Sequence, residues 1–274
     1  MSMGAWAVEY TPLGSDDIIY GKYKVISDIK VNNLQLRHVR YLDHPCDEPD
    51  QVLDQIEMSG RIDEDTTIFI KKLVKKIYES PKRCTVTTIS SEGELETDKY
   101  SVDVYLNSGG GYLKDGYELG RFFREYGVTT RISSGSQCYS SCATAFLGGL
   151  SRTMRKGSNI MFHAPYTIND KRDISCMRDS SELKDYIVRM IKPARTDNKS
   201  EDTLRKLEDD GELLYERTMS YCGRSTGWFL NEGAAFLMGI TNVYKDQLGV
   251  GVIQSKKITP DHLKKRKGWF RRKD

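Results

Sequence analysis

The feature that most constrains the fold is an alternation of strand-like and helix-like segments between residues 101 and 163. Apolar residues of SVDVYLN recur with the period of two that is typical of a strand, and those of YLKDGYELGRFFREYG recur with helical spacing. VTTRISSG predicts a second strand, SCATAFLGG a helix of small residues, and NIMF a third strand that ends at His163. Strands that alternate with helices over short loops predict an α/β fold with a largely parallel sheet.

The flanking segments complete the predicted organisation. Ile70, Val74 and Ile77 have helical spacing, and Pro81 ends that helix. Residues 170–222 are charged and mostly helical, and TGWFLNEGAAFLMGITNVY predicts a short helix and a closing strand. We therefore predict an N-terminal extension at 1–50 that contains a small β-element, with β-like stretches at Lys22–Ile26 and Leu34–Tyr41. An α/β domain at 51–250 with a charged helical insertion at 170–222 and a basic tail at 251–274 would follow.

Composition limits the classes of function. Among the 274 residues there is no apolar run of about 18, so no transmembrane helix is expected. The first residues lack the charged and apolar regions of a secretory signal, which predicts a cytoplasmic protein with reduced thiols. The net charge of +3 is too small to indicate nucleic-acid binding. The six cysteines form no CxxC pair and the four histidines are scattered, so neither a metal nor another cofactor is expected.

The basic tail leaves two interpretations open. KKRKGWFRRKD places seven Lys and Arg residues in eleven positions, around Trp269 and Phe270. Such a segment is either a solvated end of the chain or a docking segment for an acidic partner or an anionic membrane surface.

Three segments that follow predicted strands could carry chemistry. Ser140 lies between a Gly-containing turn and a helix, where a serine either caps the helix or exposes its hydroxyl beside free backbone N–H groups. The glycines of SGGG at 108–111 permit a tight turn or a close approach to a substrate. They match neither the GxGxxG motif nor the P-loop motif of nucleotide-binding proteins. His163 comes 23 residues after Ser140 and could accept its proton.

Together these segments resemble the proteolytic subunit of Clp protease and its relatives in the crotonase superfamily. The resemblance extends from Glu57 to Tyr244, with Gly109 where the family has proline. Four segments carry it in order: EMSGRIDEDTTIFIKKL, YLNSGGGYLKDGYELG, GSQCYSSCATAFLGGLSRTMRKGSNIMFHAPY and TGWFLNEGAAFLMGITNVY.

The resemblance implies a role for each site residue. Ser140 would be the nucleophile, His163 the base, and the N–H groups of Gly110 and Ser141 the oxyanion donors. The Cys-x-Ser-x-Cys pattern marks a subgroup of the family and favours Ser140 over Ser141. Cys138 and Cys142 would then either pack around the turn or form a redox-sensitive disulfide. A peptide or protein substrate, a homo-oligomer and a regulatory partner are also implied.

One position departs from the family. The acidic residue of the triad would align with Gly227, which carries no side chain. Ser225, Thr226 or an Asp from 170–210 could orient the imidazole instead, or the site could be a Ser–His dyad. Since loss of the acid costs on the order of 10⁴ in rate in the serine-protease template, we expect a weak or partner-regulated serine peptidase. The alternatives are a catalytically silent Clp-like scaffold that binds peptides and, third, an acyl-CoA enzyme of crotonase type.

Overall fold

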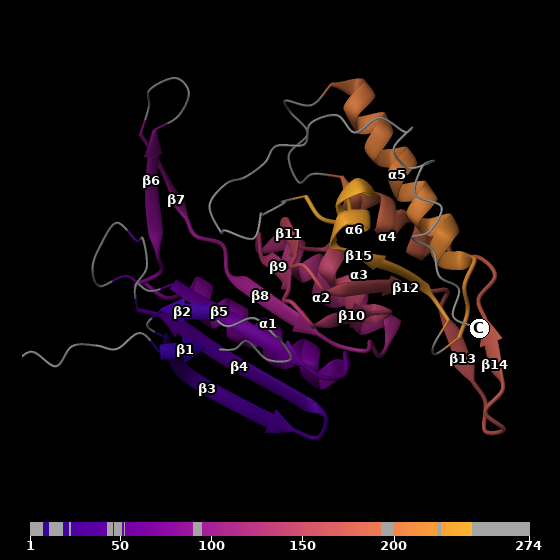
Figure 1. Ribbon diagram of the computed structural model, residues 1–274, viewed down its shortest axis with the longest axis horizontal. Helices are drawn as coiled ribbons and strands as arrows, with labels where there is room; N and C mark the ends of the chain where they lie inside the picture. Colours follow the sequence, from indigo (N-terminus) through magenta and orange to yellow (C-terminus); the bar gives the residue numbers. More distant parts are fainter. Residues whose placement is uncertain are drawn as a thin grey trace, which may run out of the picture.

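The computed structural model describes residues 8–10, 19–21, 23–42, 46, 51, 53–89, 95–192, 200–223 and 226–242. Its central sheet has six strands in the order β11-β9-β8-β5-β4-β3 (Figure 1). β5, β8, β9 and β11 are parallel to one another, whereas β4 and β3 are antiparallel. The predicted α/β class with a largely parallel sheet is confirmed. The strand bounds are β3 Tyr23–Val31, β4 Leu34–Tyr41, β5 Leu53–Ser59, β8 Asp103–Asn107, β9 Thr129–Ile132 and β11 Ser151–Met154.

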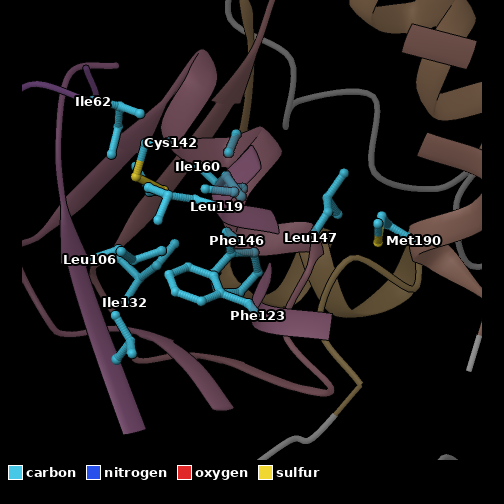
Figure 2. Packing of buried hydrophobic residues seen from close by; sticks show 14 of the residues in the cluster. Ile62, Leu106, Leu119, Phe123, Ile132, Cys142, Phe146, Leu147, Ile160 and Met190 are labelled. Carbon is cyan, nitrogen blue, oxygen red and sulfur yellow. A yellow bond between two sulfur atoms is a disulfide. The ribbon is translucent and has the colours of Figure 1, made fainter. Parts of the chain in front are cut away.

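Three helices form the core with this sheet, two of them after its strands β5 and β8 and the third after a strand of a second sheet. They are α1 Glu64–Tyr78, α2 Leu113–Glu125 and α3 Ser141–Leu147. Asp63 begins α1 by accepting a hydrogen bond from the N–H of Thr66 at 3.0 Å. Figure 2 shows Phe123 of α2 and Phe146 of α3 packed together beside Leu106 of β8. Burying such large apolar side chains is the main stabilising contribution to the fold.

A second sheet takes the chain to the candidate site. It contains β10 Gln137–Tyr139, β12 Asn159–Phe162 and β15 Trp228–Asn231, in the order β10-β12-β15. A turn with Gly135 in the left-handed region, at φ 74°, carries the chain from β9 to β10. A single bridge between Ser108 and Cys138 joins this sheet to the end of β8. The predicted short helix is α6 Glu232–Leu237, and β15 before it was not predicted. The segment of the predicted closing strand extends past residue 242, outside the described residues.

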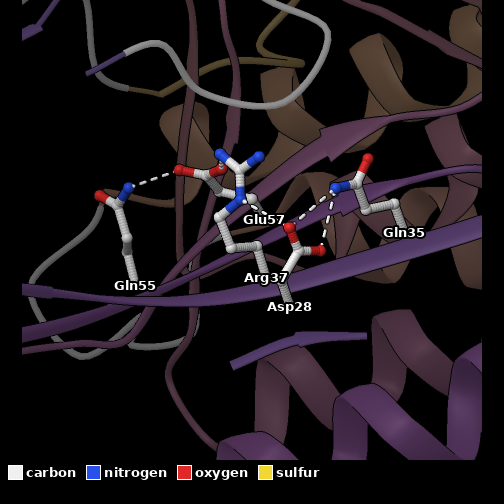
Figure 3. A network of polar contacts seen from close by, with 5 residues as sticks. All are labelled: Asp28, Gln35, Arg37, Gln55 and Glu57. Carbon is white, nitrogen blue, oxygen red and sulfur yellow. Dashed lines mark hydrogen bonds and ion pairs between the residues drawn. The ribbon is translucent and has the colours of Figure 1, made fainter. Parts of the chain in front are cut away.

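Part of the predicted N-terminal extension belongs to the central sheet. β3 and β4 pair with each other and with β5, so the sheet begins well before residue 50. Polar side chains tie these strands together (Figure 3): Arg37 of β4 lies 3.4 Å from the buried carboxylate of Glu57, which also accepts a hydrogen bond from Gln55 at 2.7 Å. Gln35 binds Asp28 across the β3–β4 pair at 2.9 Å.

The predicted helical insertion begins with a hairpin instead of a helix. β13 Tyr166–Ile168 pairs with β14 Ile174–Cys176, and α4 Ser181–Ile191 and α5 Glu201–Met219 follow. The two helices confirm the helical spacing seen in the sequence, and Ser200 caps α5. α4 packs on α3, where the Tyr186 hydroxyl donates to the carbonyl of Thr144 at 2.7 Å. Figure 1 shows this hairpin and the β6–β7 hairpin (Thr85–Ile89, Leu95–Lys99) projecting on opposite sides of the sheets; β1 Val8–Tyr10 and β2 Ile19–Gly21 form another small ribbon.

A buried arginine forms hydrogen bonds with backbone carbonyls near the C-terminal ends of several helices. Arg152 of β11 is fully buried and has no carboxylate partner among the described residues. Its guanidinium donates to five backbone carbonyls at 2.7–3.3 Å, those of Leu147, Gly149, Met190, Gly239 and Ile240. Burial lowers the pKa of Arg152 to about 9, so the cation persists at neutral pH. The carbonyl groups at helix C-termini are the natural partners of such a cation.

The expectation of reduced thiols is wrong. The six cysteines form the disulfides Cys46–Cys84, Cys138–Cys142 and Cys176–Cys222. Of the two alternatives for Cys138 and Cys142, the structure has the disulfide. The other two pairs could not be predicted, because they join residues 38 and 46 positions apart. Among the described residues, no helix is both long enough and apolar enough to span a membrane.

Candidate active site

Ser140 occupies a backbone conformation that serine rarely adopts. It lies between β10 and α3 with φ 59° and ψ −124°, in a region that glycine accepts far more readily. Its N–H donates to the carbonyl of Met161 at 2.9 Å, and no side chain caps the first turn of α3. A non-glycine residue held in such a conformation costs on the order of 1–3 kcal/mol and occurs most often at functional sites. A sharp strand–Ser–helix turn is also how hydrolases expose a nucleophilic hydroxyl.

The neighbouring Ser141 is placed differently. Its side chain is 1% exposed and packs against α2, where a Cβ added to Gly116 would lie 2.9 Å from the Ser141 Cβ. Ser140 lines the large cavity described below, and Ser141 does not. Of the two serines, only Ser140 can present its hydroxyl to a ligand in that cavity.

His163 follows β12 and lines the same cavity as Ser140. Its Nδ1 lies 2.8 Å from the carbonyl oxygen of Ala164. A carbonyl can only accept a hydrogen bond, so the neutral ring carries its proton on Nδ1 and leaves the lone pair of Nε2 free. Burial lowers the pKa of His163, and the hydrogen bond to Ala164 opposes that shift only partly. The imidazole is therefore neutral at physiological pH, as a general base must be.

Within the part of the chain that the structure describes, no carboxylate takes the position of the triad acid. Gly227, aligned with that acid, has Met161 Sδ where a side chain would project, and the carbonyl of Phe162 lies 3.0 Å from that point. Thr226 is exposed, and Ser225 lies outside the described residues. No hydrogen bond links His163 to any of the described Asp side chains between 170 and 210. Some of those are engaged elsewhere: Asp173 with Asn169, Asp179 with Tyr215 and Asp202 with Arg205.

The glycine loop after β8 comes into direct contact with the nucleophile turn. Gly110 has φ 99°, and a Cβ there would lie 2.7 Å from both the Ser140 Cβ and the carbonyl of Tyr139. Only glycine fits this approach. The N–H of Gly110 donates to the hydroxyl of Ser108 at 3.0 Å, so this expected oxyanion donor already has a partner. The N–H of Ser141 lies in the uncapped first turn of α3, where backbone donors lack partners within the helix.

A cavity of about 700 Å³ brings these groups together. Part of its wall was not anticipated from the sequence, because it comes from the segments before α1 and after β12 and from α4 and α5. One segment of this wall did stand out in the sequence, namely the one that resembles the family opening. In the structure, its Ile62 pairs with Gly111 of the predicted glycine loop. Beyond Ser140, His163 and the glycines 109–111, the lining consists of Arg61, Tyr112, Leu113, Thr144, Phe162, Pro165, Tyr166, Thr167, Ile168, Leu183, Ile187 and Thr218.

Two disulfides border the site. Cys138–Cys142 spans the nucleophile turn, with Cα atoms 5.1 Å apart and both side chains fully buried. The second pair joins exposed Cys176 of β14 to Cys222. Next to Cys222, the carbonyl of Tyr221 accepts the N–H of Ala164 at 2.8 Å. The backbone that orients His163 is thus linked to the β13–β14 hairpin.

Comparisons with known proteins give similar structures only. No family model matches the chain, and no curated protein sequence matches it. A mutant of the membrane-bound stomatin-specific protease 1510-N is 13% identical over 68% of this chain and 75% of that chain, with a TM-score of 0.43. A second mutant of that protease, in complex with a substrate peptide, is 14% identical over 71% and 75%, with a TM-score of 0.45. A ClpP1 mutant from Listeria monocytogenes is 14% identical over 71% and 93%, with a TM-score of 0.41. These identities are too low to transfer the role of any residue, so function is argued from this chain's own site.

Proposed function

We propose that this chain is a serine hydrolase that cleaves peptide bonds, with Ser140 as nucleophile and His163 as base. The observation that carries the proposal is the strained backbone of Ser140, in a cavity that it shares with a neutral, half-buried histidine. Glycine would relieve that strain, and a serine there supplies a hydroxyl to the cavity. A hydroxyl becomes a competent nucleophile when an adjacent base removes its proton.

In the proposed reaction, Nε2 of His163 accepts the proton of Ser140 as the hydroxyl oxygen attacks the substrate carbonyl. The N–H of Ser141 donates to the oxygen that becomes negative, and His163 then protonates the leaving amine. Water, deprotonated by the same imidazole, releases the acyl group and regenerates Ser140. The carbonyl of Ala164 holds the Nδ1 proton in place of a carboxylate. A neutral carbonyl stabilises the imidazolium less than a carboxylate does, so we expect slow turnover.

A fluorophosphonate probe tests this proposal. The wild-type protein should become labelled, and both Ser140→Ala and His163→Ala should abolish labelling. Ser141→Ala is the matched control, since it removes a neighbouring hydroxyl that does not line the cavity, and it should retain labelling. Labelling that survives Ser140→Ala, or that disappears in Ser141→Ala with the fold intact, would overturn the assignment of Ser140.

Three observations favour a second candidate, a catalytically silent scaffold that binds peptides in the same cavity. The described residues show no hydrogen bond between Ser140 and His163 and no carboxylate on the imidazole, and Gly110 N–H is bound to Ser108. The Ser108→Ala variant separates the two functions, because it frees the N–H of Gly110. Labelling that appears only in this variant indicates a site held inactive by Ser108; peptide binding without labelling in either protein indicates a scaffold.

The wider expectations from the sequence remain proposals. A homo-oligomer and a regulatory partner can be tested by sedimentation of the full chain. The basic tail lies outside the described residues, so its docking to an acidic partner or membrane surface calls for deletion of residues 264–274. Cytoplasmic localisation stays a prediction, and three disulfides count against it because such bonds persist mainly in oxidising compartments.

A further inference from the structure

Arg61 is the one permanently charged side chain among the described residues that line the cavity. Apolar and aromatic residues such as Phe162, Ile168 and Leu183 share the rest of the cavity wall with uncharged polar residues and glycines. Ligand cavities typically combine an apolar lining with a few polar groups that fix specificity. A single cation in such a lining therefore points to the charge of the ligand.

The backbone holds Arg61 beside the glycine loop. The N–H of Ile62 donates to the carbonyl of Gly110 at 3.0 Å, and the N–H of Tyr112 donates to the carbonyl of Ile62 at 2.9 Å. These two hydrogen bonds fix the segment that carries Arg61 alongside the loop that touches Ser140. The fold thus fixes the backbone of Arg61 relative to the nucleophile turn. The conformation of the flexible Arg61 side chain then decides where the guanidinium lies.

The guanidinium of Arg61 is available to a ligand. It lies 4.6 Å from the centre of the exposed Tyr112 ring, and it forms no ion pair with any described carboxylate. Asp63, the acidic residue nearest to Arg61 in sequence, already accepts hydrogen bonds from the backbone N–H and the hydroxyl of Thr66 at 3.0 and 2.9 Å. Stacking on an aromatic ring restricts the side chain while leaving its planar set of donors free for a carboxylate.

We propose that Arg61 and Tyr112 form a carboxylate subsite, and that the cavity selects peptides with an apolar segment and a carboxylate close to the scissile bond. The proposal rests on the proposed function and names the substrate class of that site. The carboxylate can come from an Asp or Glu side chain or from the C-terminus of the peptide, and both present the same planar group to the guanidinium.

Binding to the Ser140→Ala protein tests the subsite without relying on catalysis. The probes are short fluorescent apolar peptides that are identical except for the anion: an internal Glu with an amidated end, an internal Gln with an amidated end, and an internal Gln with a free C-terminus. We expect the Glu or the free-carboxylate peptide to bind roughly fivefold more tightly than the Gln amide, as for a partly exposed charge pair. Whichever of the two gains affinity identifies the source of the carboxylate.

Variants of Arg61 assign the effect to this side chain. Arg61→Gln should remove the preference, Arg61→Glu should reverse it, and Arg61→Lys should retain part of it without the two-pronged geometry. Lys72→Gln is the matched control, because it changes the net charge equally at an exposed position of α1 outside the cavity. Thermal unfolding of each variant checks that the fold is kept.

Equal affinity for the three peptides, or a preference that survives Arg61→Gln, would overturn the subsite. Failure of every peptide to bind would overturn it as well. Fluorophosphonate labelling of Ser140 in the wild-type protein is measured in parallel, so a missing subsite is distinguished from a missing hydrolase. A labelled enzyme without carboxylate preference refutes only the role of Arg61.

Discussion

The two ends of α3 differ in how their polar groups are satisfied. At its C-terminal end, Arg124 and Arg152 donate to the carbonyls of Leu147, Gly148 and Gly149. At its N-terminal end no side chain caps the helix, and Ser140 has strained backbone angles beside an open cavity. Two arginines, the fully buried Arg152 and the half-buried Arg124, stabilise one end, while the other end leaves donors and strain available to a ligand. Stability and function thus come from opposite ends of one short helix.

Replacing Ser140 tests this division most strongly. Ser140→Gly should lower peptide hydrolysis by about 10⁴-fold or more, because it removes the nucleophile. The same change should raise the free energy of unfolding by about 1 kcal/mol, since glycine adopts these backbone angles without strain, and the relieved strain exceeds the extra conformational entropy that glycine loses on folding. Chemical denaturation and hydrolysis assays measure the two effects. Ser140→Ala is the control: it should lose activity without gaining stability.

At the other end of α3 we expect the reverse result. Arg152→Met should lower the free energy of unfolding by about 3 kcal/mol, because it leaves buried carbonyls without their donor. Urea denaturation checks this value. The folded fraction of the variant should keep its rate of fluorophosphonate labelling. A variant of unchanged stability would show that the carbonyls find other donors and would contradict the proposed role of the arginine.

The two disulfides near the site should differ in reactivity. Mild reductant should open Cys176–Cys222, which has an exposed partner, before the fully buried Cys138–Cys142. Since the first pair is linked through Tyr221 to the backbone that orients His163, we expect a roughly tenfold loss of kcat with KM little changed. Mass spectrometry of alkylated cysteines identifies the opened pair. Cys222→Ser should reproduce the loss without reductant, and full activity in that variant would count against the link.

The smallest expected effect is a displaced pH profile. Burial lowers the pKa of His163 from the usual histidine value of about 6.5. The imidazole therefore stays neutral, and able to act as a base, at pH values somewhat below 6.5. The kcat/KM should therefore reach half its maximum at a pH below 6.5. The same shift has a consequence for stability: as the pH falls below 6.5, the unfolded chain binds the proton more readily than the folded one, and the free energy of unfolding decreases. A midpoint above 6.5 would contradict the lowered pKa of this half-buried imidazole.

The sequence predicted features with a local or periodic cause. Helical spacing gave α1 and α2, and glycine-containing turns after strands placed Ser140 and the 108–111 loop at one edge. It could not predict contacts that depend on distant segments, such as the carbonyls around Arg152, the bond between Gly110 and Ser108, or the disulfide partners of Cys46 and Cys176. The β13–β14 hairpin was missed because its strands have three residues each, YTI and ISC, which is too short for their alternation to indicate a strand.

The set of carbonyls around Arg152 also bears on when the chain can fold during synthesis. Two of its five acceptors belong to Gly239 and Ile240, 87 and 88 residues after the arginine. A nascent chain that ends before these residues would bury the Arg152 cation without two of its carbonyl acceptors, which is costly in a low-dielectric interior. Completion of the core is thus tied to the last described segment, and ribosome-bound chains should resist proteolysis only after that segment has emerged.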